Sequence, residues 1–122
     1  MDSIIRSQAA DITYNMTTTG FDLPGYRIVS NLGVVRGVVV RSRSLIGTFG
    51  AGLQTIFGGN ISLFTELAER TRKQAFDTML VHADVAGAHA VIGIRYDATE
   101  VMQGATEVIC YGTAVRVEPL VG

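Results

Sequence analysis

The stretch that decides the fold is LFTELAERTRKQAFDTMLVHADVA, residues 63–86. Apolar side chains recur in it at the three- and four-residue spacing of one helical face, and the charged side chains fall on the opposite side. The members of the apolar face are Phe64, Leu67, Ala68, Thr71, Ala75, Met79, His82 and Ala86, with Phe76 and Leu80 at its border. Gly87 follows as a stop signal, because glycine readily adopts the left-handed conformation that ends helices. The pattern predicts one amphipathic helix over residues 63–86.

Three segments rich in β-branched residues flank this helix. Residues 26–43 predict one or two strands, with a bend or bulge at the glycines within them. Residues 90–96 and 107–117 predict two further strands, joined by a loop or hairpin with Gly104 at its bend. The resulting β-α-β-β order predicts an α+β fold in which one long helix packs on a small antiparallel sheet.

Length and composition restrict the organisation of the chain. Its 122 residues are the length of one domain, and we expect a flexible or partner-ordered leader over residues 1–20 before a single α+β domain over residues 21–122. The leader lacks the basic start and apolar run of a secretory signal, which predicts a cytoplasmic location. The uncharged window 44–65 contains five glycines, so we expect no membrane span. A net charge of -1 argues against nucleic acid as a partner.

The predicted strands are apolar on both faces. In residues 107–117, small side chains such as Cys110 and Ala114 alternate with large ones such as Ile109 and Val115, and neither set is polar. A single helix covers only one face of a sheet, so the other face needs another cover. We expect a symmetric homo-oligomer to supply it. The alternative is that the glycine-rich segment 44–62 folds back over that face.

The sequence contains no motif of an enzyme. The glycine string at residues 47–52 lacks the Gly-Lys-Ser/Thr ending of a phosphate-binding loop, so tight turns or close subunit approach explain it better. No activated nucleophile or acid–base pair stands at a recognisable spacing. We therefore predict a protein that is not an enzyme.

The candidate ligand-binding residues are few. Cys110 is the sole cysteine, and its thiolate would be a soft ligand for a metal ion, although one cysteine per chain is too few for a closed site unless symmetry multiplies it. The alternative is a buried cysteine that packs as a small apolar residue. His82 and His89 are further metal-ligand candidates, but their spacing is not the i,i+4 pair of helical zinc sites, and packed or interface histidines are the alternative.

Three polar residues are candidates for lining a small-ligand pocket. They are Arg36, Tyr96 and Asp97. Their side chains offer an anion-binding group, a hydroxyl group and a carboxylate.

Three long segments together resemble one known family. They are LPGYRIVSNLGVVRGVVVRSRS at residues 23–44, FGGNISLFTELAERTRKQA at 57–75 and GAHAVIGIRYDATEVMQGATEVICYGTAV at 87–115. The chain resembles the YbjQ family of small bacterial and archaeal proteins, which is associated with heavy-metal binding. The resemblance implies a dodecin-like α+β subunit that associates with copies of itself into a ring, most often a pentamer.

The chain departs from the family pattern at one cysteine. Members often have a second cysteine in a T-E-L-C segment of the helix, where this chain has Ala68. Cys110, in the match to the family's C-Y-G-T-A segment, is the remaining thiol, so a soft metal ion is the cofactor that the resemblance suggests. A ring that acts as a scaffold and binds no metal is the alternative.

Overall fold

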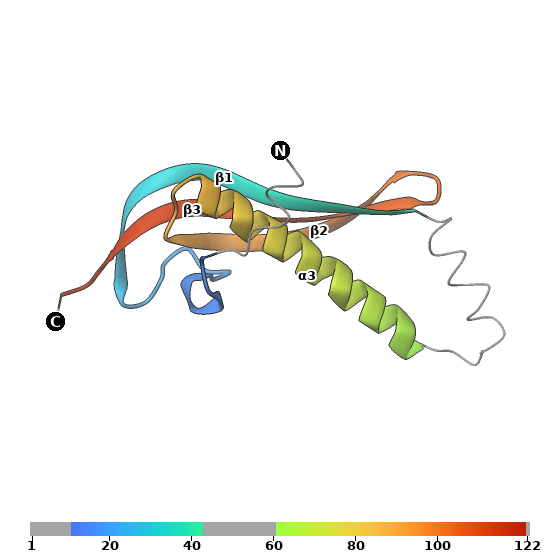
Figure 1. The fold of residues 1–122 in the computed structure, drawn as a ribbon, viewed down its shortest axis with the longest axis horizontal. Helices are drawn as coiled ribbons and strands as arrows, with labels where there is room; N and C mark the ends of the chain where they lie inside the picture. The colour runs from blue at the N-terminus through green and yellow to red at the C-terminus, as the bar shows by residue number, and fades with distance from the viewer. Residues whose placement is uncertain (1–10, 43–60, 122) are drawn as a thin grey trace.

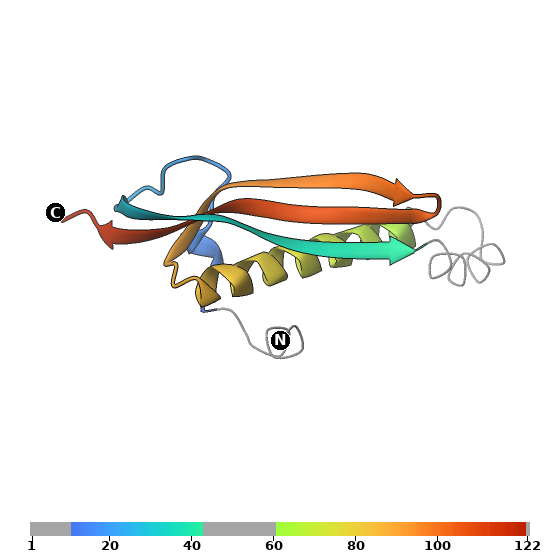
Figure 2. The ribbon, with the colours of Figure 1, turned by 90° about the horizontal axis from the view of Figure 1, so that it is seen from above.

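The protein has two layers, a sheet and one helix that lies on a single face of it (Figures 1 and 2). The computed structural model describes residues 11–42 and 61–121. Its elements are the 3-10 turn η1 (Tyr14–Met16), strand β1 (Tyr26–Ser42), helix α3 (Ile61–Val85), and strands β2 (Ala90–Met102) and β3 (Ala105–Pro119). The sheet is antiparallel with the order β1-β3-β2. This architecture confirms the predicted α+β class and the β-α-β-β order.

The β2–β3 hairpin is longer than the sequence predicted. Residues 97–105, expected to be a loop or hairpin, form a hairpin that continues both strands, so that Thr99 pairs with Glu107. The chain reverses at Gln103 and Gly104, where Gly104 has a φ of +82°. The pairing has one irregularity before the turn, between Glu100 and Met102. The β-branched Thr99 and Val101 favour the extended backbone.

Helix α3 buries a face that is rotated from the predicted one. Its buried side chains beyond Thr71 include Ala75, Phe76, Met79, Leu80 and Ala83. Ala68 and Ala86, both predicted to face the sheet, are exposed. Gly87 ends the helix as predicted, with a φ of +85° and an N–H that donates to the Asp84 carbonyl at 2.9 Å.

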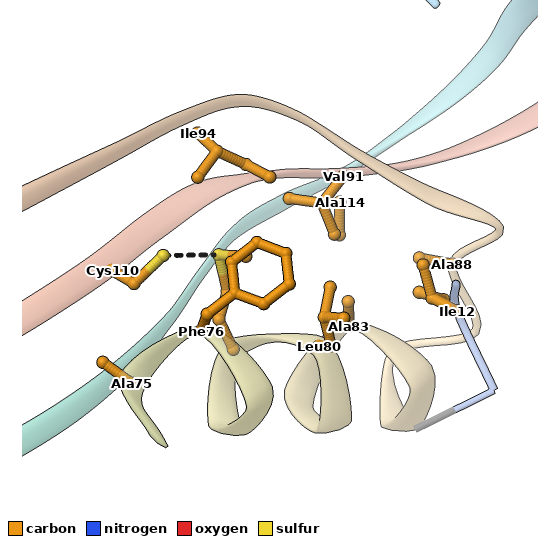
Figure 3. Packing of buried hydrophobic residues seen from close by; sticks show 11 residues of the cluster. Ile12, Ala75, Phe76, Leu80, Ala83, Ala88, Val91, Ile94, Cys110 and Ala114 are labelled. Atoms are coloured by element: carbon orange, nitrogen blue, oxygen red, sulfur yellow. Dashed lines mark hydrogen bonds between the residues drawn. The ribbon is translucent and has the colours of Figure 1, made fainter. Parts of the chain in front are cut away.

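Two apolar clusters lie on opposite faces of the sheet. Figure 3 shows the first, in which helix and sheet side chains interlock; it consists of Ile12, Ala75, Phe76, Met79, Leu80, Ala83, Ala88, Val91, Ile94, Cys110 and Ala114. The second consists of Leu23, Ala90, Ile92, Val115 and Val117. The paired residues of an antiparallel sheet point to the same face, so Val115 and its partner Ala90 lie on the face away from α3.

Residues 11–23 connect the two clusters by passing around the β2 edge. Thr18 donates its N–H to the Val91 carbonyl and accepts the N–H of Ile94, both at 3.1 Å. Ile12 is buried in the helix-side cluster, and Leu23 is buried in the cluster on the other face. Residues 11–20 belong to the segment predicted as a leader, and here they contact the domain; residues 1–10 lie outside the described part of the chain.

We call the face of the sheet away from α3 the outer face. At the end near Leu23 it is covered, but along β1 it presents Val34, Val38 and Val40, with exposed fractions of 71%, 41% and 54%. Across the strand pairs, Ile109 and Tyr111 continue this face on β3. Most of the glycine-rich segment considered as an alternative cover lies outside the described residues. Within residues 11–42 and 61–121, no helix combines the length and apolar character needed to cross a membrane.

Candidate functional site

Cys110 occupies the middle strand of the sheet on the side of the helix. It pairs with Tyr96 of β2 and with Gly37 of β1, so the three residues form one row across the sheet. The Cys110 side chain is fully buried. Its thiol donates a hydrogen bond to the Sδ atom of Met79 in α3, with 3.7 Å between the two sulfurs, and the dashed line in Figure 3 marks this contact.

The surroundings of Cys110 favour the neutral thiol. Burial raises the pKa of Cys110 above its ordinary value of 9.0, and a hydrogen bond with Tyr96 partly opposes this shift. Burial also raises the pKa of Tyr96 to about 12, reinforced by the neighbouring Cys110 and opposed by Arg72. The Arg72 guanidinium lies 5.6 Å from the centre of the Tyr96 ring, in a cation–π arrangement.

The donor atoms at this site suit some metals and not others. A thiol and a thioether are soft donors, the type that Cu(I) and similar thiophilic ions prefer. A structural zinc site needs four donors, chiefly Cys and His. Among the residues that the structure describes, no group of three or more His, Cys, Asp or Glu side chains could hold a metal ion. The sulfur pair therefore fits a soft ion with few ligands and does not fit a structural zinc ion.

The structure does not bring the two histidines together with Cys110. His82, half-buried near the end of α3, has its Nδ1 atom 2.7 Å from the backbone oxygen of Arg36. His89 is exposed, and its Nδ1 atom lies 3.0 Å from both the backbone nitrogen and the backbone oxygen of Val117. The Nδ1 atom of each histidine is thus within hydrogen-bond distance of strand backbone atoms.

The three pocket candidates separate onto two faces of the sheet. Tyr96 points to the helix side, whereas Arg36 and Asp97 lie on the outer face on either side of Tyr111. The Tyr111 hydroxyl donates to the Asp97 carboxylate at 2.9 Å. This hydrogen bond raises the pKa of Tyr111 above its usual range.

Sequence reasoning missed three participants, namely Met79, Arg72 and Tyr111. Met79 had a signal, because it belongs to the predicted apolar helical face, but its contact with Cys110 depends on how the helix lies across the sheet. Arg72 and Tyr111 likewise acquire their partners only through tertiary packing and strand register.

The sequence profile of the YbjQ family, described as "Putative heavy-metal-binding", matches residues 15–118. The chain belongs to the YbjQ family. A UPF0145 protein of Chromobacterium violaceum is 64% identical over 107 residues, which cover 88% of this chain and 92% of the relative. A UPF0145 protein of Solibacter usitatus is 61% identical over 108 residues, covering 88% and 96% of the two chains.

A solved structure supports the fold of this YbjQ family chain. It is a crystal structure of a protein with unknown function, of the DUF74 family, from Pediococcus pentosaceus. The TM-score is 0.55 at 18% sequence identity, and the match covers 84% of this chain and 96% of that chain. The likeness concerns the fold alone.

Proposed function

We propose that the protein functions as a homo-oligomer, a ring of five copies, in which neighbouring copies cover the outer face of the sheet. The observation that carries the proposal is the row of exposed valines on β1. Val34, Val38 and Val40 project from one strand onto a face that the described residues leave open. Exposed apolar side chains gathered on one face, here with the exposed Arg36 between Val34 and Val38, are typical of an association site. The number five follows the resemblance to ring-forming members of the family.

Replacement of the valines tests this proposal. The wild type is expected to have five times the mass of one chain by light scattering or sedimentation. Val34→Lys should shift the protein to smaller species, because a charge would replace apolar contact, whereas its far-UV circular dichroism should stay unchanged. Val85→Lys is the matched control, since Val85 is a 64% exposed valine at the end of α3. A wild type with the mass of one chain at micromolar concentration contradicts the proposal.

Binding of a soft metal ion by Cys110 is a second candidate function, favoured by the sulfur of Met79 at 3.7 Å. A bound Cu(I) or Ag(I) ion would be held by the thiolate and the thioether. Because the buried thiol has a raised pKa, binding must release its proton, so affinity should rise with pH, by up to about tenfold per pH unit.

Metal titration tests this candidate. Wild-type protein should bind Ag(I) with the ultraviolet absorption of a metal–thiolate bond. The absorption should vanish in Cys110→Ala, and the affinity should fall in Met79→Leu. Met102→Leu is the control, because Met102 is 67% exposed at the end of β2. Equal metal content in wild type and Cys110→Ala eliminates this role and favours a scaffold without a metal ligand.

A further inference from the structure

The two edges of the sheet differ in charge. Strand β1 is one edge, and all its charged side chains are arginines, namely Arg27, Arg36 and Arg41. Strand β2 is the other edge, and its charged side chains are Arg95 and the acids Asp97 and Glu100. The Arg95 guanidinium already donates hydrogen bonds to the Thr19 and Ile94 carbonyls. Edge strands present unpaired backbone N–H and C=O groups and are ready templates for pairing with another chain. The β1 edge thus carries only cations, whereas the β2 edge carries two carboxylates and one arginine that is hydrogen-bonded within its own chain.

Arg36 is the arginine of β1 whose guanidinium has no hydrogen-bond or ion-pair partner among the described residues, and its backbone oxygen lies 2.7 Å from Nδ1 of His82 in α3. Arg27 forms an ion pair with Glu118, and Arg41 donates hydrogen bonds to Thr71 and Gln74 of α3. The exposed Arg36 side chain lies on the outer face between Val34 and Val38. Apolar neighbours of this kind would exclude water from an ion pair formed there, which strengthens the pair.

Asp97 occupies the matching position on the other edge. It is exposed, it lies on the same outer face as Arg36, and its hydrogen bond from Tyr111 occupies only part of its accepting capacity. The beginning of β2 is already bonded to the segment around Thr18, so among the described residues the open part of this edge lies beyond Ile94. This open part contains the acids Asp97 and Glu100, together with Arg95, whose guanidinium is hydrogen-bonded to the Thr19 and Ile94 carbonyls.

We infer that a second copy of this chain is the partner of each edge, with β1 of one copy lying along residues 96–102 of the next and Arg36 paired with Asp97. The inference rests on the proposed homo-oligomer. Pairing β1 with β1 would bring arginines together, and pairing β2 with β2 would bring carboxylates together, both of which are unfavourable. Pairing unlike edges is favourable, keeps Arg36 and Asp97 on one face of a continuous sheet, and makes a head-to-tail contact of the kind that closes into rings.

Charge reversal tests this arrangement. Each single change, Arg36→Glu or Asp97→Arg, should raise the concentration at which the assembly dissociates by at least about tenfold, because like charges then meet across the contact. The double variant should return to within about threefold of wild type, since the pair is restored in reversed order. The two single variants, when mixed, should associate with each other more tightly than either does with itself, because each contact between different variants joins opposite charges; a ring of five copies retains one contact between identical variants.

A control separates this effect from local damage. Arg70→Glu makes the same charge change on the exposed side of α3, and it should assemble like wild type. If the wild type is oligomeric but the single reversals leave dissociation unchanged, or the double variant shows no recovery, the edge pairing is wrong and the homo-oligomer stands. A wild type that remains a single chain overturns both.

Discussion

Gly37 of β1 packs against the backbone of Ala75 in α3 with no room for a side chain between them. A Cβ atom at position 37 would overlap the Ala75 carbonyl oxygen and lie 2.7 Å from the backbone nitrogen of Met79. Both atoms belong to the helix backbone, which cannot move aside as a flexible side chain would. The glycine therefore lets α3 approach the sheet closely enough for Met79 to reach Cys110.

Gly37→Ala should accordingly destabilise the protein. We expect the free energy of unfolding to fall by about 1 to 3 kcal/mol, because the methyl group forces the helix and strand apart. Urea unfolding at one fixed protein concentration measures this, since association would otherwise shift the result. Gly20→Ala is the control, because a Cβ atom there would have its nearest neighbour at an ordinary 3.5 Å. Equal loss in both variants would contradict a specific helix–strand contact.

Phe76 is the largest side chain of α3 in the described helix-side cluster, and only 5% of it is exposed. Phe76→Ala should lower the free energy of unfolding by about 3 to 5 kcal/mol, because it leaves a cavity between helix and sheet. Val85→Ala, at a 64% exposed position of the same helix, should change it by less than about 0.5 kcal/mol. A Phe76→Ala variant that unfolds like wild type would mean that the helix faces the sheet differently.

The sequence predicted the helix and the three strands because each has a local signal. The apolar spacing of α3 and the stop at Gly87 require no knowledge of the rest of the chain. The rotation of the buried face toward Ala83 had no such signal, since alanine fits either side of a helix. It depends on where the sheet lies, which is a tertiary property.

The candidate site was predictable in part. Cys110 is conspicuous as the sole cysteine, but its contact with Met79 joins residues far apart in the chain and follows from the packing of α3 on the sheet. The burial of Ile12 likewise depends on residues that are far from it in the chain. It is an isolated apolar residue in a polar stretch, with no periodic pattern, and it is nevertheless buried against the helix-side cluster.

Ile12 gives a test of how firmly residues 11–20 belong to the domain. Ile12→Ala should lower the free energy of unfolding by about 2 to 4 kcal/mol, because the side chain is only 7% exposed within the core cluster. Thr19→Ala, at an exposed position of the same segment, should be nearly neutral. Loss of hydrogen-exchange protection at Ile94, whose N–H donates to Thr18, should accompany the first variant alone. An Ile12→Ala variant as stable as wild type would indicate a leader independent of the domain.

The pair formed by Cys110 and Tyr96 predicts a loss of stability in alkaline solution. Both pKa values are raised by folding, that of Cys110 from 9.0 and that of Tyr96 from 10.0 to about 12. Below pH 9 both groups are neutral in the folded and the unfolded chain, so their contribution to the free energy of unfolding is fully present. Above it the unfolded chain loses these protons first, and the free energy of unfolding falls until the folded pKa values are passed.

Urea unfolding between pH 8 and about 11, and tyrosine absorbance near 295 nm followed to about pH 13, measure this effect. Tyr96→Phe should remove the tyrosine absorbance change with a midpoint of about 12, and it should flatten the decline of stability with pH. Cys110→Ala creates a small cavity that lowers stability at every pH. For this variant the informative quantity is therefore the change of the free energy of unfolding with pH, not its absolute value. The remaining decline in each variant should be smaller than in wild type. A wild-type free energy of unfolding that stays level or rises across this range would show that the neutral forms of Cys110 and Tyr96 are not the ones that the fold stabilises.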